Sequence, residues 1–221
     1  VSYKSLNKIV SNLAISLYNF GIRKNDKIGL VLNNSLEFIY IMLAAAKIGA
    51  AIVPLNTTLP VPTIVHNLLF TKAKFLICWH SVLNKILLNK KFKKVFEKKS
   101  ISVGLQINNC KYFQDFIKEN KNYKKKINKT NFINKNYIIS LTSGSTGSPK
   151  PIILTQKTKV LRALLVKKLY KLTSKDIIIA ATPLEHSLSQ RLVFLPLIMG
   201  ATLVLLKNFS NKIWINEVKK N

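Results

Sequence analysis

Residues 140–151 read SLTSGSTGSPKP, a run of small residues that ends in a lysine between two prolines. Residues 137–139 (YII) precede this run and residues 152–154 (IIL) follow it, and both flanks have the β-branched and aromatic composition of strands. The sequence therefore predicts a strand–loop–strand unit whose loop can approach a ligand closely.

The loop carries the groups that bind an oxyanion. Gly144 and Gly147 can adopt positive φ, which lets backbone N–H groups come near a ligand. Hydroxyl donors and one compact positive charge are supplied by Thr142, Ser143, Ser145, Thr146 and Lys150. Neither the Walker A spacing G-x-x-x-x-G-K-[ST] nor the dinucleotide fingerprint G-x-G-x-x-G fits. A phosphate-binding loop of another kind is expected.

Residues 142–150 match [ST]-[ST]-G-[ST]-T-G-x-P-K at every position. The loop resembles the signature of the adenylate-forming superfamily, which includes acyl-CoA synthetases, luciferases and peptide-synthetase adenylation domains. Pro151 departs from the glycine that the family usually has there. A Ser/Gly-rich surface turn that binds nothing is the alternative interpretation. Residues 44–56 (AAAKIGAAIVPLN) are similar to another segment of the family, L-A-x-x-x-x-G-A-x-x-V-P-L-N.

Residues 181–187 (ATPLEHS), with PLIMGATLVLL at 196–206, resemble the acyl-CoA synthetase segment P-L-x-H-x-x-G followed by L-x-x-G-A. The resemblance implies that His186 lines the acyl-substrate pocket, whereas a lone histidine after a strand is otherwise a structural or surface residue. The F-D-x-S motif of amino-acid-activating members is absent, and residues 187–190 replace the aromatic or glycine residues that usually follow the histidine.

The alternation of β and α patterns predicts an α/β fold with mainly parallel sheets flanked by helices. Helices are expected at 3–20, 36–48, 60–70, 81–89 and 156–170, and strands at 27–32, 51–55, 74–79 and 176–181. The apolar strand 176–181 should be covered on both faces. Residues 1–89 form a first βα section, residues 90–136 a basic, poorly ordered connector with a strand at 100–105 and a helical piece at 112–118, and residues 137–221 the phosphate-loop section.

The chain has 221 residues, 48% of them hydrophobic, which is enough for a substantial core, and it starts at Val1. We expect the first part of the large N-terminal domain of an adenylate-forming enzyme, inactive alone and completed by a C-terminal part in cis or in trans. Two distant cysteines, Cys78 and Cys110, fit a reducing compartment, so a cytoplasmic location is expected. Peripheral association with a membrane is compatible with this location. Glu37 and Lys47 argue against a transmembrane span over 36–55.

Thirty-six Lys+Arg against eight Asp+Glu give a formal charge of +28, which raises the alternative of a non-catalytic module that binds nucleic acid or an anionic membrane surface. The basic runs 90–94 and 121–129 lack a nucleic-acid-binding motif and contain few aromatic residues, so no specific nucleic acid is expected. The three histidines have no metal-ligand spacing, and no protein metal site is expected.

The resemblance implies ATP-dependent activation of a carboxylate to an acyl-adenylate, followed by transfer to coenzyme A. ATP, Mg2+ and coenzyme A are the implied co-substrates and cofactor. In this reading residues 142–150 hold the β- and γ-phosphates, with Thr146 and Lys150 as the catalytic residues. The reaction joins two anions, so the site must neutralise and position phosphates.

Overall fold

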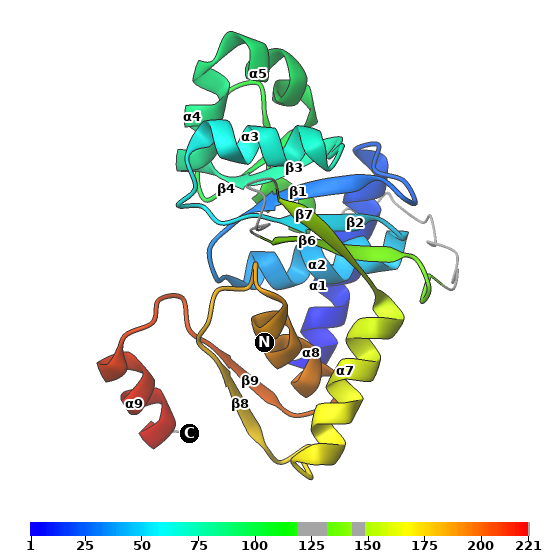
Figure 1. Ribbon diagram of the computed structural model, residues 1–221, viewed down its shortest axis with the longest axis vertical. Coiled ribbons are helices and arrows are strands. Elements are labelled where there is room, and N and C mark those ends of the chain that lie inside the picture. The colour runs from blue at the N-terminus through cyan, green and yellow to red at the C-terminus, as the bar shows by residue number, and fades with distance from the viewer. Residues whose placement is uncertain (119–131, 143–148, 221) are drawn as a thin grey trace.

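The computed structural model describes residues 1–118, 132–142 and 149–220, and it has two sheets (Figure 1). The larger sheet has seven strands in the order β5-β4-β3-β1-β2-β6-β7, and the smaller pairs β8 with β9. The strands are β1 Lys27–Val31, β2 Ala51–Pro54, β3 Phe75–Trp79, β4 Ser100–Val103, β5 Lys111–Tyr112, β6 Asn136–Thr142, β7 Lys150–Thr155, β8 Ile177–Ala180 and β9 Thr202–Leu205. All pairings are parallel except β6 with β7, which confirms the predicted α/β fold with mainly parallel sheets.

Helices cover both faces of the large sheet (Figure 1). They are α1 Tyr3–Asn19, α2 Leu36–Ile48, α3 Val61–Phe70, α4 His80–Leu88, α5 Lys90–Phe96, η1 Glu97–Lys99, α6 Phe113–Ile117, α7 Gln156–Leu169, α8 Ser187–Met199 and α9 Asn211–Lys220. Helices α1, α2 and α6 share one apolar core, and α3, α4 and α5 share the other. None of these described helices is both long and apolar enough to cross a membrane.

Local sequence explains where several helices begin and end. The Ser35 and Thr155 hydroxyls accept from the backbone N–H groups of Phe38 and Thr158, so each side chain caps the first turn of its helix. Gly49 ends α2 with φ of 71°, a conformation that other residues adopt at a cost. These caps confirm the helix boundaries that the sequence predicts here.

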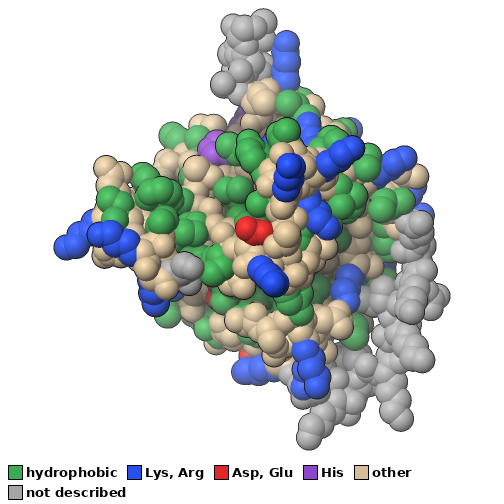
Figure 2. All heavy atoms as spheres, turned by 90° about the horizontal axis from the view of Figure 1, so that it is seen from below, with side chains coloured by type: hydrophobic (Ala, Val, Ile, Leu, Met, Phe, Trp, Pro, Cys, Tyr) green, Lys and Arg blue, Asp and Glu red, His purple; other side chains and the backbone are tan. Residues whose placement is uncertain are grey.

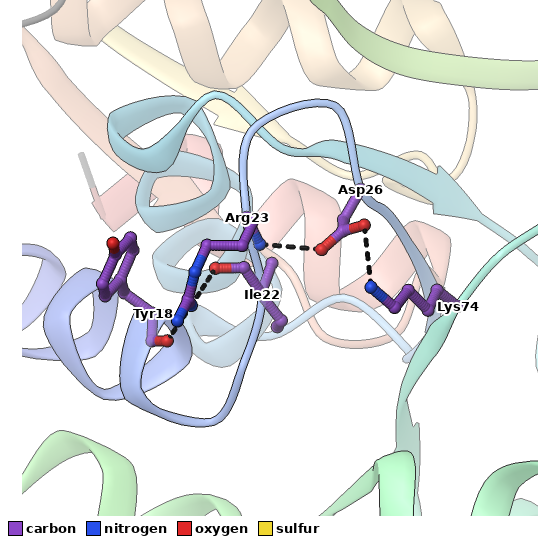
Figure 3. Close-up of polar contacts among 5 residues, drawn as sticks. All are labelled: Tyr18, Ile22, Arg23, Asp26 and Lys74. Carbon is purple, nitrogen blue, oxygen red and sulfur yellow. Dashed lines mark hydrogen bonds and ion pairs between the residues drawn. The ribbon is translucent and has the colours of Figure 1, made fainter.

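The turn between α1 and β1 is fixed by polar contacts (Figure 3). The Arg23 guanidinium donates to the carbonyl oxygens of Tyr18 and Ile22 and lies 3.9 Å from the centre of the Tyr18 ring. The Asp26 carboxylate accepts from the backbone N–H of Arg23 at 2.8 Å and pairs with Lys74 Nζ at 3.4 Å. These contacts join the end of α1 to the start of β3, at the edge where the parallel strands begin.

Residues 90–117 contain more regular structure than the sequence predicts. The strand β4 and the helix α6 lie within their expected ranges, and α5 and β5 were not expected. Phe96, Phe113 and Phe116 are buried and anchor this segment to the two cores. The many lysines of this segment are mostly exposed, and they hide the few buried aromatic positions when the sequence is judged by its composition.

The environment of β8 corrects the prediction for residues 176–181. The strand pairs with β9 outside the seven-stranded sheet, and Ile177 is 41% exposed. Helix α8 contacts both β8 and β9, whereas the side chain of Ile177 stays exposed, so the two faces of this apolar strand are not covered equally.

Further apolar side chains on α7 and α9, such as Leu165 and Trp214, are also exposed. On the face shown in Figure 2, Lys and Arg side chains are spread among hydrophobic and neutral ones.

Asn34 links the two sheets at the carboxyl ends of their strands. Its Nδ2 donates to the carbonyl oxygens of Thr182 at 3.0 Å and Leu206 at 3.1 Å, and its Oδ1 accepts from the backbone N–H of Leu184 at 2.8 Å. The residue is only 8% exposed. A side chain that follows β1 thus satisfies backbone groups that follow β8 and β9.

We predict that Asn34→Ala destabilises the protein by about 2–4 kcal/mol, because two buried backbone groups and one half-buried backbone group lose their partner. Urea unfolding measured by circular dichroism gives the difference in unfolding free energy. Asn33→Ala is the matched control: Asn33 is exposed and accepts one hydrogen bond, from the Thr57 hydroxyl. Equal unfolding free energies for the two variants would contradict a linking role for Asn34.

Candidate functional site

A cavity of about 710 Å³ lies at the carboxyl ends of β2 and β6. It is bounded by the segment after β2, by α3, by both ends of the 143–148 loop and by the turn before α8. Its described lining residues are Pro54, Leu55, Asn56, Leu59, Pro62, Thr63, His66, Asn67, Leu141, Thr142, Pro149, Glu185 and His186. Ligands of parallel α/β domains characteristically bind at this edge of the sheet.

The structure brings both ends of the predicted phosphate loop to this cavity. Thr142 and Lys150 are register partners in the β6–β7 pair, and Thr142 Oγ1 donates to the Lys150 carbonyl oxygen at 3.3 Å. Thr142 and Pro149 line the cavity, while Lys150 is exposed at the start of β7. The remaining predicted loop residues, Ser143, Gly144, Ser145, Thr146 and Gly147, lie outside the described residues.

His186 lines the same cavity as Thr142. It holds the N-cap position of α8, where its side chain makes no capping hydrogen bond, and it is exposed. Its backbone N–H donates to the Pro183 carbonyl oxygen at 3.1 Å. His186 therefore borders a ligand-sized space, and its ring makes no hydrogen bond to another of the described residues.

The turn that carries His186 is held from behind by Gln190. Gln190 Nε2 donates to the carbonyl oxygens of Leu184 at 2.9 Å and Glu185 at 3.4 Å, and Gln190 is completely buried. Asn34 binds the backbone N–H of Leu184 from the other side. Two buried carboxamides thus fix the residues immediately before His186.

Lys159 is a buried cation behind this turn. Its Nζ donates to Ser187 Oγ at 3.2 Å and to Gln190 Oε1 at 2.5 Å, and Arg162 Nη1 donates to the same Ser187 Oγ at 3.3 Å. Burial, together with the charges of Arg162 and Arg191, lowers the pKa of Lys159 to about 7. No acidic side chain within the described residues is bonded to this amine.

Sequence reasoning did not identify Asn34, Lys159 or Gln190 as supports of the site. The sequence of α7 does not reveal the buried position of Lys159, because leucines of this helix such as Leu161 and Leu165 are exposed while Lys159 and Ala163, four residues apart, are buried. A second, smaller cavity of about 460 Å³ shares Asn56 and Glu185 with the first. Hydroxyl and amide side chains, including those of Asn33, Thr57 and Asn208, line it.

The described residues contain no group of three or more His, Cys, Asp and Glu side chains that could hold a metal ion. Glu185 contributes a carboxylate to the cavity wall. One carboxylate is too few to hold Mg2+ alone. It is compatible with Mg2+ that enters together with a nucleotide, because most ligands of the ion are then phosphate oxygens and water.

A mainly parallel sheet with a cavity at the carboxyl ends of its strands is the architecture of α/β ligand-binding domains. A family model described as AMP-binding enzyme matches residues 1–221, and the chain belongs to that family. The resemblance noted in the sequence is thereby confirmed.

Two curated relatives illustrate the range of the family. The chain is 27% identical to the crotonobetaine/carnitine–CoA ligase of Salmonella paratyphi B over an alignment 236 positions long, which covers 99% of this chain and 43% of the relative. It is 28% identical to a dimodular nonribosomal peptide synthase of Bacillus subtilis, with 94% of this chain and 8% of the relative covered. The chain thus spans less than half of these relatives.

Solved structures confirm the fold. O-succinylbenzoate coenzyme A synthetase of Bacillus subtilis, in complex with ATP and magnesium ion, matches with a TM-score of 0.82 and 23% identity over all of this chain and 55% of that one. A long-chain-fatty-acid–CoA ligase of Archaeoglobus fulgidus matches with a TM-score of 0.84 and 21% identity, over all of this chain and 43% of that one.

We predict that Lys159 makes stability depend on pH. An unfolded lysine keeps its proton up to its ordinary pKa of 10.5, whereas the folded pKa is about 7, so folding releases a proton between these values. Stability should therefore rise with pH from about 7 to 10.5, by at most about 1.4 kcal/mol per pH unit. Relative to Lys159→Met, the wild type should gain stability over this range.

Urea unfolding at pH 7, 8, 9 and 10 measures this difference. Lys157→Met is the matched control, because Lys157 is exposed on the same helix, and its offset from the wild type should stay constant. Parallel pH profiles for the wild type and Lys159→Met would show that Lys159 titrates alike in the folded and unfolded states.

Proposed function

We propose that the protein takes part in ATP-dependent activation of a carboxylic acid to an acyl-adenylate, followed by transfer of the acyl group to the thiol of coenzyme A. The observation that carries the proposal is the single cavity on which both ends of the 143–148 loop and His186 meet. Membership of the AMP-binding enzyme family and the ligase names of several relatives support it.

Two displacements make up the proposed reaction. A carboxylate oxygen of the acid bonds to the α-phosphorus of ATP, and the bond from that phosphorus to the bridging oxygen breaks, so pyrophosphate leaves. The thiol sulfur then bonds to the acyl carbon, AMP leaves with the bonding electron pair, and the thiol proton passes to solvent or to a nearby base. Both reactants of the first step are anions, so the chief obstacle is electrostatic repulsion.

Residues of the 142–150 loop would supply the compensating charge. Backbone N–H groups, the Thr146 hydroxyl and the Lys150 ammonium group are suited to hold the β- and γ-phosphates and to stabilise departing pyrophosphate. When bound with the nucleotide, Mg2+ would neutralise phosphate charge, and Glu185 is the carboxylate that the described part of the cavity wall offers. His186 would contact the acyl substrate in the same cavity.

Lys150→Ala and Thr146→Ala should each slow acid-dependent ATP–pyrophosphate exchange by about 10- to 1,000-fold, because each removes a donor to developing phosphate charge. The measurement uses the full-length gene product and a panel of short, medium, long and aromatic acids. Lys157→Ala removes an exposed lysine a few residues beyond the loop and should leave the exchange rate unchanged. Wild-type exchange in both loop variants would refute this assignment of the loop.

His186→Ala should raise the KM for the carboxylic acid by about tenfold and leave the KM for ATP within a factor of two. The reason is that His186 lies on the cavity wall, whereas the phosphate groups are assigned to the loop. Steady-state kinetics with acid and ATP varied in turn separate the two constants. A change confined to the KM for ATP would place His186 in the nucleotide site instead.

A further inference from the structure

Asn67 is a buried polar residue whose side chain has no hydrogen-bond partner among residues 1–118, 132–142 and 149–220. It is 7% exposed and lines the 710 Å³ cavity. Its backbone carbonyl accepts from the Thr71 backbone and hydroxyl at 3.0 and 2.7 Å. Its carboxamide makes no hydrogen bond within the described part of the chain. The carboxamide atoms are not among the fully buried polar atoms that lack a partner. The amide therefore points at the space of the cavity.

An apolar side chain would suit this position of α3 better within the chain alone. Ile64, Val65 and Leu68, the buried neighbours of Asn67 on the helix, all pack into the second core. Among the described residues the carboxamide has no partner and is open only to the cavity, and a nearly buried polar group of this kind calls for a reason. Thr63 and His66 lie four and one residues earlier and also line the cavity, so the helix presents a polar wall there.

The charge of this wall restricts what it can bind. The chain has 36 lysine and arginine residues, and none of them is among the described residues that line the cavity. Glu185, in the turn before α8, is the only lining residue with a fixed charge in the described ranges. A phosphate or carboxylate beside α3 would therefore be desolvated without a cation, which is unfavourable.

The donors and acceptors of Asn67 restrict the ligand further. A carboxamide offers one oxygen acceptor and an NH2 donor. An alkyl chain would satisfy neither, and an anion would satisfy only the donor. A secondary amide has both an N–H group and a carbonyl oxygen, so it can pair with Asn67 through two hydrogen bonds.

We propose that Asn67 is a specificity-determining residue whose carboxamide hydrogen-bonds a secondary amide in a ligand that lies along α3. This inference rests on the proposed function, and it assigns the α3 wall to a neutral amide and the loop to phosphates. The amide belongs either to the arm of the acceptor thiol or to the acid substrate itself. The experiment below separates these two sources.

The test compares the full-length wild type with Asn67→Leu, which keeps the approximate size and removes both hydrogen-bonding groups. In the acceptor arm, kcat/KM for thioester formation is measured with N-acetylcysteamine, which has one secondary amide, and with 1-pentanethiol, which has none. In the acid arm, kcat/KM for ATP–pyrophosphate exchange is measured with 4-acetamidobutanoate and with heptanoate. In one arm, the kcat/KM of Asn67→Leu should be about tenfold below that of the wild type for the amide compound and less than twofold below it for the amide-free counterpart.

Asn84→Leu, on the exposed surface of α4, is the matched control and should behave as the wild type in both arms. Asn67→Asp keeps the shape and the acceptor but removes the donor, so it replaces the leucine variant if that protein does not fold. An unchanged preference for the amide compound in both arms overturns the proposal.

Failure of the proposed function would be recognised separately, as the absence of exchange with every acid. In that case ligand-observed NMR with N-acetylcysteamine and 1-pentanethiol, on the wild type and Asn67→Leu, still decides whether the α3 wall binds an amide. Weaker binding of N-acetylcysteamine alone to the variant supports the proposal, and equal binding to both proteins overturns it.

Discussion

Asn34, which follows β1 of the large sheet, satisfies backbone groups that follow both strands of the small sheet. Its carboxamide binds the carbonyl oxygens that follow β8 and β9 and the backbone N–H of Leu184, and the side chain itself is almost completely buried. Unpaired, these groups would each carry a desolvation cost. The position of the Leu184–His186 turn therefore depends on a residue that follows β1, about 150 positions earlier in the chain.

The support of this turn explains how a short loop can present a side chain to the cavity with a defined geometry. Gln190 binds the turn from α8, and Lys159 binds Gln190 and Ser187 from α7. Each member of this chain of contacts is buried or half-buried, so the hydrogen bonds compete little with water. Burying the amine of Lys159 disfavours its charged form, so its pKa is lowered to about 7. Within the described residues no carboxylate pairs with this amine.

Local patterns in the sequence predicted most of the large sheet and its helices. Ser35, Gly49 and Thr155 mark helix ends through side-chain or backbone properties that act within a few residues. The roles of Asn34 and Asn67 could not be predicted in this way, because the first depends on partners far along the chain and the second on the absence of a partner. The pairing of β8 with β9 alone was missed because an apolar strand does not reveal which sheet it joins.

The distribution of charge around the cavity separates two kinds of chemistry. Positive charge lies at the end of the loop, where Lys150 begins β7, and is absent from the described lining of the α3 wall despite the +28 charge of the chain. Negative groups of a ligand are therefore favoured near the loop, since a carboxylate moved away from the loop would leave the cation. Under the proposed function, the carboxylate and the phosphates would lie at the loop end of the cavity, and the neutral remainder of the ligand would extend along α3. This separation orients a ligand before any covalent step, which is the contribution that positioning makes to catalysis.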